Sequence, residues 1–422
     1  PVEQVLEVER RGTDDLIWPS FLPDGRHFLY HLRRYAADGR TGQILVGSLD
    51  GSAPKVLLQA NSGAAYSPAG FLLWWDKGNL KAQRFDTETL SLEGEPAALV
   101  ADVRFDPRSA VAAFSVSASG SLVYQRGGAL SGNQLTWLDR QGHSLGPVGP
   151  SGSLYDPRLS PDGSLIVVDM SDETNQGDLW VIDAQRGRSE RLTSGPQDES
   201  CPVWSPDGQS VAYCSVVGED RYGIFVRPAA GTGEARLAAE DPPRSLYPLD
   251  WHGDAVLAIA RREGPEANED IVVASMKDGS TRSLAGSEFQ ENGAAFSPDG
   301  RYVAYTSDET GRDEIYVRPT SGPGRASRVS VDGGRMARFS PDMSEIFFFS
   351  PRNEFMSAPI TRPAGGLQFG DPRPLFHADV KVQETAEWDT HDGKRFLMNL
   401  NVRAGAKDPL TLVQGWTSAL AR

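Results

Sequence analysis

One short turn sequence recurs along this chain at a nearly constant spacing, and this repetition constrains the fold more than any other feature. It reads SPDG at residues 160–163, 205–208 and 297–300. LPDG, SPAG, SASG, WHGD, SPDM and THDG are related copies, and the third residues of all copies stand at 24, 69, 119, 162, 207, 253, 299, 342 and 392. Such a period over the whole length predicts an array of equivalent units.

Each unit has the pattern of four short antiparallel strands. In the most regular copy, apolar residues alternate before the turn at Ala294 and Phe296 and again after it up to Tyr305, which is the two-residue period of a strand. SPDG suits the four positions of a type I turn. A third strand stops at Pro319, and a fourth follows near residues 327–330. Four antiparallel strands in about 45 residues form one blade of a β-propeller.

We therefore predict an all-β fold, a single β-propeller over residues 1–422 built from four-stranded antiparallel blades. Nine copies of the turn predict nine blades, although propellers usually have four to eight. An eight-bladed ring with one irregularly used repeat is the alternative. Residues 4–8 precede the first copy, and the last repeat ends at residues 410–416 without a fourth strand. We expect this N-terminal strand to complete the last blade and close the ring, which would remove exposed edges.

Composition argues against several classes of partner. The net charge is −15, from 57 acidic and 42 basic residues, and the basic residues form no cluster beyond pairs such as Arg33 and Arg34. We therefore expect no nucleic-acid partner. No apolar run approaches the roughly 18 residues that span a bilayer, so a membrane span is expected only outside this segment. The chain starts at Pro1, and we expect it to be part of a longer protein.

The sequence lacks the motifs of the common catalytic sites. We find no G-x-S-x-G elbow, H-E-x-x-H motif, P-loop or dinucleotide fingerprint, and no Cys/His spacing typical of zinc. We therefore expect that this chain is not an enzyme and needs no cofactor. Cys201 and Cys214 flank one turn, so they would lie on adjacent strands. They form either a cross-strand disulfide or two buried free thiols.

Three acidic residues recur at one position of alternate repeats. Glu199, Glu291 and Glu384 each stand eight residues before the third residue of the turn, in the fifth, seventh and ninth repeats. At the start of the innermost strands, they would surround one mouth of the channel. Carboxylate oxygens are ligands for hard cations such as calcium. The hypothesis is a site for Ca²⁺ or another cation, or for an amine, and the alternative is three solvated loop carboxylates.

A second candidate surface is a pair of loops that combine both signs of charge with an aromatic side chain. We hypothesise that these loops bind a small ligand or a protein partner, and ordinary solvated loops are the alternative. The residues are Glu219, Arg221, Tyr222, Asp308, Arg312 and Asp313.

Several phrases of the sequence resemble one protein family over nearly the whole chain. SPDG followed by DEIYVRP or DLWVID is similar to the TolB-type, WD40-like (PD40) propeller repeat. WPSFLPDGRHFLYHLR, GEPAALVADVRFDP, QLTWLDRQGHSLGPVG and PLTLVQGWTSAL further resemble the C-terminal propeller of acidobacterial-type bacterial serine/threonine protein kinases. The sixth repeat departs from the family pattern, with DWHGD in place of SPDG.

The resemblance implies a kinase domain in cis and one membrane span elsewhere in the protein. This segment would then lie outside the cytoplasm, on the periplasmic side of the inner membrane, as a sensor module that binds a ligand or a protein. None of the kinase motifs is present in the segment itself. A TolB-like periplasmic scaffold for protein–protein interaction, or an accessory propeller that gates a hydrolase domain, are the alternatives.

Overall fold

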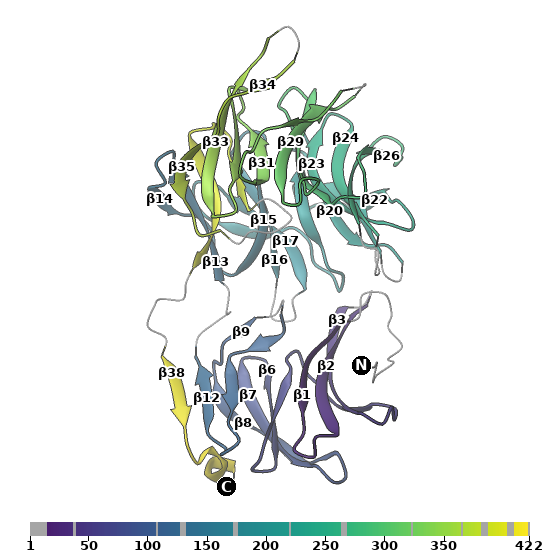
Figure 1. Cartoon of the computed structure of the whole chain (residues 1–422), viewed down its shortest axis with the longest axis vertical. Helices are drawn as coiled ribbons and strands as arrows, with labels where there is room; N and C mark the ends of the chain where they lie inside the picture. The colour runs from purple at the N-terminus through teal and green to yellow at the C-terminus, as the bar shows by residue number, and fades with distance from the viewer. Residues whose placement is uncertain are drawn as a thin grey trace. The chain divides into compact units, whose positions relative to one another are not determined.

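The computed structural model consists almost entirely of β-strands. It describes residues 15–36, 39–106, 109–126, 132–171, 176–218, 221–262, 268–321, 324–363, 366–380, 387–402 and 409–420. In these ranges the only helix is the short 3-10 helix η1 (Trp416–Leu420), and none is long and apolar enough to cross a membrane. The chain forms two compact units (Figure 1): unit 1 is Pro1–Gly132, Ser171–Gln176 and Val402–Arg422, and unit 2 is Asn133–Met170 and Gly177–Asn401.

Every copy of the repeated turn joins the first and second strands of a sheet, as the sequence predicted. At residues 160–163 the Gly163 N–H donates to the Ser160 carbonyl oxygen over 2.8 Å, and Gly163 has a φ of +70°. The Ser160 hydroxyl donates to Asp162 and accepts from the Leu165 N–H. This hydroxyl and the backbone N–H of Ser164 lower the pKa of Asp162 to about 2. The turn is therefore held by its own side chains.

Among the described residues, unit 2 forms six sheets, and five of them consist of strands that follow one another along the chain. The first is β15 (Ser153–Leu159), β16 (Leu165–Ser171), β17 (Gly177–Asp183) and β18 (Ser189–Arg191). The second is β19 (Ser200–Trp204), β20 (Ser210–Val216), β21 (Tyr222–Pro228) and β22 (Arg236–Ala239). The third is β23 (Ser245–His252), β24 (Ala255–Arg261), β25 (Glu269–Ser275) and β26 (Thr281–Ala285). The fourth is β27 (Glu291–Phe296), β28 (Tyr302–Ser307), β29 (Glu314–Pro319) and β30 (Ser327–Arg328). The fifth is β31 (Arg335–Phe339), β32 (Glu345–Phe349), β33 (Glu354–Thr361), β34 (Gln368–Phe369) and β35 (Arg373–His377).

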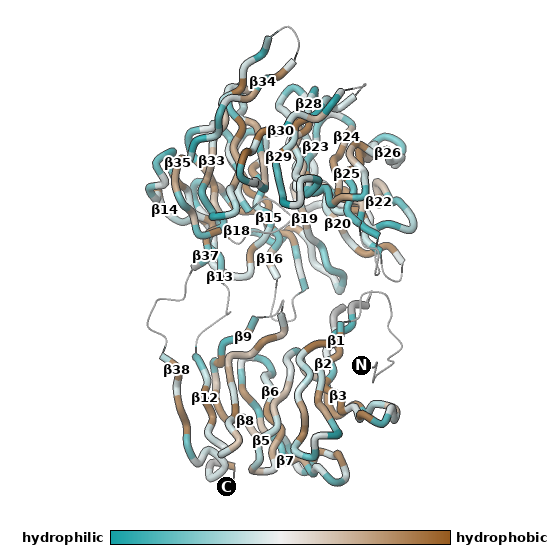
Figure 2. The backbone as a smooth tube through the Cα atoms, viewed as in Figure 1, coloured by the Kyte–Doolittle hydropathy of each residue, from teal (hydrophilic) through white to brown (hydrophobic). Residues whose placement is uncertain are grey.

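The sixth sheet closes unit 2 into a ring by joining both ends of its chain. Its order is β14 (Ser144–Pro147), β13 (Gly132–Asp139), β37 (Arg395–Val402) and β36 (Trp388–Asp389), and Figure 2 labels β13 and β37 side by side. The first strands of successive sheets contact one another from β15 to β31, and β36 contacts β15. The Trp388 indole N–H donates to the Met336 carbonyl oxygen over 2.9 Å, which links β36 to β31. The ring is therefore complete.

In the part of unit 1 that the structure describes, there are three sheets and one short strand pair. The sheets are β1 (Asp15–Phe21), β2 (His27–Ala36), β3 (Gly39–Ser48) and β4 (Lys55–Gln59); β5 (Ala64–Ser67), β6 (Phe71–Asp76), β7 (Asn79–Asp86) and β8 (Ser91–Ala101); and β11 (Phe114–Val116), β12 (Leu122–Gln125) and β38 (Leu410–Val413). The short pair is β9 (Phe105–Asp106) and β10 (Val111–Ala112). Strand β38, yellow in Figure 1, returns from the C-terminal end to pair with β12.

The all-β propeller fold with four-stranded antiparallel sheets is confirmed, but the predicted ring needs correction. The sequence predicted one nine-bladed ring, or eight blades as the alternative, closed by an N-terminal strand. Instead β13 pairs with β37 rather than with β12, so six sheets close on themselves in unit 2. The closing strands come from residues 132–147, and residues 4–8 lie outside the described residues. The physical reason is that equivalent repeats have equivalent strand edges. A strand such as β13 can therefore pair with the second strand of its own repeat or with that of another repeat.

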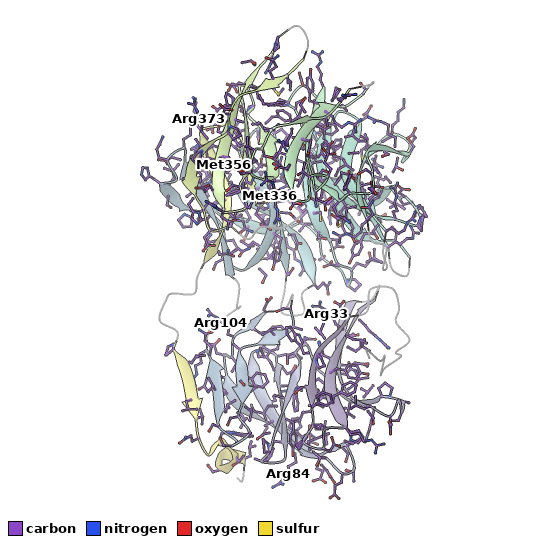
Figure 3. All side chains as sticks on the ribbon, viewed as in Figure 1. Arg33, Arg84, Arg104, Met336, Met356 and Arg373 are labelled. Carbon is purple, nitrogen blue, oxygen red and sulfur yellow. The ribbon has the colours of Figure 1, made fainter. Side chains whose placement is uncertain are left out.

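The core of unit 2 lies between neighbouring sheets, where apolar strand faces meet. Figure 2 shows the hydrophobic segments along the strands. One cluster gathers Phe347, Phe355, Trp388 and Phe396 with Met336, which is labelled in Figure 3. The rings of Phe355 and Trp388 meet edge to face with centroids 4.7 Å apart. Because sheets bury their faces only against neighbouring sheets, this packing fixes the ends of the first strands around the centre of the ring.

Candidate functional site

A pocket of about 440 Å³ lies in unit 2 where the first strands of all six sheets end. Each sheet contributes to its wall, so the pocket occupies the centre of the ring. The residues from the strand ends are Arg158 and Leu159, Val203 and Trp204, Asp250 to His252, Ala295 and Phe296, Arg338 and Phe339, and Asp389. Concave sites with a few charged groups among apolar side chains are typical of small-molecule binding.

The rim of the pocket is formed by the repeated turns. Four sheets present the proline of their turn there, and the third and sixth sheets present a histidine at the same repeat position. The prolines are Pro161, Pro206, Pro298 and Pro341, and the histidines are His252 and His391. Each histidine packs on the next sheet's turn, because a Cβ atom at Gly300 would lie 2.3 Å from the His252 ring and one at Gly163 would lie 2.8 Å from the His391 ring.

Two aspartates in the wall tie neighbouring sheets together. Asp250 accepts hydrogen bonds from the N–H groups of Phe296 (2.8 Å) and Trp251 (3.0 Å). Asp389 accepts in the same way from the N–H groups of Leu159 (2.8 Å) and Thr390 (2.8 Å). The other four sheets carry an apolar residue at this repeat position, namely Leu159, Trp204, Phe296 and Phe339. Both carboxylates therefore already accept backbone hydrogen bonds at the ends of their strands.

Two arginines bring positive charge to the same wall. The Arg158 residue is 6% exposed, and the Arg338 side chain is 13% exposed. Arg338 Nε lies 3.8 Å from Asp389 Oδ1. Burial, and then the charge of Arg338, lower the pKa of Arg158. Burial raises the pKa of Asp250, while the charges of Arg338 and Arg158 oppose that shift. These groups therefore act on one another electrostatically within the pocket.

The structure places two of the three predicted glutamates, and both are buried rather than solvated. Glu199 directly precedes β19 and is 9% exposed, and Glu291 begins β27 and is 4% exposed. Burial raises the pKa of both carboxyl groups, to about 7 for Glu199. The Ser287 hydroxyl donates to Glu291 over 2.5 Å. Glu384 lies outside the described residues, so the three-carboxylate cation site stays a prediction.

No metal centre is formed by the parts of the chain that the structure describes. Within those ranges, no group of three or more His, Cys, Asp or Glu side chains is placed to hold a metal ion.

The side chains of the predicted partner loops form hydrogen bonds and ion pairs with nearby residues of the chain. Glu219 lies outside the described residues. Arg221 pairs with Glu240 (3.6 Å), and Tyr222 donates a hydrogen bond to Asp198 (3.5 Å). In the second loop Asp308 accepts from the Gln290 N–H (2.9 Å), Arg312 pairs with Glu314 (2.7 Å) and Asp313 pairs with Arg335 (2.5 Å). A partner surface at these loops stays a prediction.

The two cysteines lie on adjacent strands, as predicted, and both are free thiols. Cys214 pairs in register with Ser200, and Cys201 follows at a register shift with a φ of +55°. A hydrogen bond with Cys214, and then burial, raise the pKa of the Cys201 thiol.

Sequence reasoning missed the charged residues of the pocket. The signal was present as departures from the repeat, because Asp250 and Asp389 replace an apolar residue and His252 and His391 replace a proline. By sequence alone, WHGD and THDG counted as related copies of the turn. Only the ring shows that the third and sixth sheets face each other across the channel.

Comparisons with known proteins show the fold. No family model matches the chain. It is 28% identical over 160 residues to the uncharacterized peptidase YuxL of Bacillus subtilis. The matched region is 38% of this chain and 22% of YuxL. The chain is 22% identical over 228 residues to the uncharacterized protein Atu1656 of Agrobacterium fabrum, which covers 54% of this chain and 56% of that protein. The chain thus spans only part of the length of either relative. A structure from Agrobacterium tumefaciens described as TolB superposes with a TM-score of 0.51 at 19% identity, over 64% of this chain and 98% of that one. This likeness shows that the chain has a TolB-like β-propeller fold.

Proposed function

We propose that this chain is a non-catalytic binding module whose binding site is the central pocket of unit 2. The observation that carries the proposal is the convergence of Arg158, Asp250, Arg338 and Asp389 on one concave site at the centre of a closed ring. The rest of the wall is formed largely by prolines and aromatic rings. Such a site can orient a ligand through a few charges while apolar walls exclude water.

The geometry favours binding over catalysis. Both aspartates accept two backbone hydrogen bonds, which hold them as structural acceptors. The two histidines at the rim pack against the turn glycines of the next sheets.

The resemblance of several sequence phrases to kinase-linked propellers supports one setting for the module. We propose that it is the extracytoplasmic, periplasmic sensor part of a membrane-anchored serine/threonine kinase, with the pocket receiving the signal. A TolB-like periplasmic scaffold that binds a protein is the second setting. The similarity to the peptidase YuxL over 160 residues favours a third, a propeller that serves a hydrolase domain. The coding sequence around this segment distinguishes these settings by the domain it encodes.

The partner loops extend this proposal to a second surface. Tyr222 and Arg312 would contribute contacts to a protein partner there, independently of the pocket.

A variant that fills the pocket tests the proposed site. Pro298 lies on the rim and is exposed, and the same repeat position accepts a ring side chain at His252 and His391. Pro298→Trp should therefore fold and obstruct the mouth. A thermal-shift screen of carboxylates, amines, sugars and peptides should find ligands that raise the melting temperature of the wild type, because a ligand that binds only the folded state stabilises it. Those ligands should bind Pro298→Trp at least tenfold more weakly.

Pro23→Trp is the matched control. Pro23 holds the same position in the LPDG turn of unit 1 and is also exposed, so this variant should bind the screened ligands as the wild type does. The proposed site is wrong if ligands bind Pro298→Trp and the wild type equally well.

A further inference from the structure

In the pocket of unit 2, the Nε atom of Arg338 is a buried hydrogen-bond donor without an acceptor in the described part of the chain. The carboxylate oxygen of Asp389 lies 3.8 Å from it, beyond hydrogen-bonding range. A buried N–H donor without an acceptor costs free energy, which an acceptor brought by a ligand would recover.

A second guanidinium, that of Arg158, lines the same pocket. Arg158 is the penultimate residue of β15 and Arg338 lies in β31. The sheet that carries Asp389 lies between their sheets in the ring. Arg158 is 6% exposed, so its charge is weakly screened. A guanidinium group can donate two parallel hydrogen bonds to a planar anion. Arg158 Nη1 already donates to the Pro157 carbonyl oxygen over 3.0 Å, so Arg158 adds its positive charge to the site.

The aspartates decide which kind of anion fits. Asp250 and Asp389 also line the pocket, so two negative charges balance the two positive ones. A singly charged carboxylate can be added to this arrangement with little repulsion, whereas a doubly charged phosphate would meet both aspartates in a site of low dielectric. A cation would compete with the backbone N–H groups that already donate to both aspartates.

We propose that this pocket binds the carboxylate group of a small organic acid, with Arg338 as the hydrogen-bond donor and Arg158 as a second positive charge. The apolar part of the acid lies against the aromatic side chains of the wall, among them Trp204, Phe296 and Phe339. The volume of about 440 Å³ suits a ligand of this size. This inference rests on the proposed function, since it names the ligand class of the same site.

Three related probes test the assignment on the whole chain by titration calorimetry. Phenylacetate carries the ring and the carboxylate, phenylacetamide has nearly the same shape without the charge, and phenyl phosphate carries the doubly charged group. Phenylacetate should bind at least tenfold more tightly than either of the others. Equal binding of phenylacetamide, or tighter binding of phenyl phosphate, would overturn the inference.

Substitution at Arg338 then locates the donor. Arg338→Gln should weaken phenylacetate binding at least tenfold, and Arg338→Lys should weaken it less, because lysine keeps the charge but not the planar fork. Arg335→Gln is the matched control, the same change in the same strand at a residue that pairs with Asp313 and does not line the pocket. It should alter affinity less than twofold. Wild-type affinity in Arg338→Gln would refute the role of Arg338.

The outcomes separate this inference from the proposed function. If Arg338→Gln does not fold, the comparison of the three probes on the wild type still decides. If amines or sugars bind and Pro298→Trp abolishes their binding, while phenylacetate shows no preference over its amide, the pocket is the binding site and the carboxylate assignment is wrong.

Discussion

Replacing Glu199 with glutamine should change the way in which stability depends on pH. Glu199 is 9% exposed at the start of β19. Burial, assisted by the negative charge of Asp178, raises the pKa of its carboxyl group from 4.5 to about 7, while a hydrogen bond with Thr193 opposes this shift. In the unfolded chain the same carboxyl group would titrate near its ordinary value.

The sign and the size of the effect follow from linkage. Between these two pKa values the folded chain retains a proton at Glu199 that the unfolded chain has released, so the free energy of unfolding falls as pH rises. The difference of about 2.5 pKa units corresponds to at most about 3.4 kcal/mol at about 1.36 kcal/mol per unit. Solvent screening reduces this to about 2 kcal/mol. Glu199→Gln removes this titration and leaves a neutral side chain of similar shape.

Urea unfolding of both proteins between pH 4.5 and pH 8 measures the effect as a difference, which cancels the other titrating groups. The stability of Glu199→Gln relative to the wild type should rise by about 2 kcal/mol over this range. Glu190→Gln is the control, because its side chain is 71% exposed in β18. A difference between Glu199→Gln and wild type that stays constant within about 0.5 kcal/mol would refute the reasoning.

Two further predictions concern the ring and the thiols. Asp389→Ala should destabilise unit 2 by about 1–3 kcal/mol, because the buried Leu159 N–H loses its acceptor. Asp389→Asn keeps an acceptor oxygen and should destabilise the unit less. Denaturant unfolding measures both variants, and equal losses of stability would contradict this reason. Cys201 and Cys214 should react with Ellman's reagent at least tenfold more slowly in the folded protein than in urea, because the Cys214 side chain is buried and the raised pKa of Cys201 suppresses its thiolate. Fast labelling without urea would contradict this expectation.

Local features of the sequence predicted the blades but not how they associate. The turn residues, the two-residue period and the spacing are properties of one repeat, and all nine turns lie where the sequence placed them. The closure of the ring depends on whether β13 pairs with β12 or with β37, and both offer the edge of an antiparallel hairpin. Which strand β13 pairs with depends on packing between residues that are far apart in the sequence, such as the Trp388 side chain against Met336. A pattern within one repeat cannot predict such packing.

Sequence patterns likewise predicted part of the candidate site and missed the rest. Glu199 and Glu291 stood out by their regular spacing, and the structure buries both at the start of strands. Arg158 and Arg338 stand four residues before the third residue of their turns, at a position that is apolar in the other four sheets of unit 2. An alignment of the repeats with one another would have found both arginines, as charged residues at a position that is otherwise apolar. Their convergence on one pocket required the ring.

The distribution of charge around the ring explains why a pocket built from repeats can orient a ligand. Identical blades would surround the channel with identical side chains, and such a symmetric site has no preferred direction for a small acid. In unit 2 the fifth, sixth and first sheets carry Arg338, Asp389 and Arg158 side by side, while Asp250 stands alone on the third sheet, opposite them. One half of the channel wall is therefore net positive and the other net negative. A carboxylate is drawn to the first half and its apolar end faces the second, so the departures from the repeat supply the asymmetry that recognition needs.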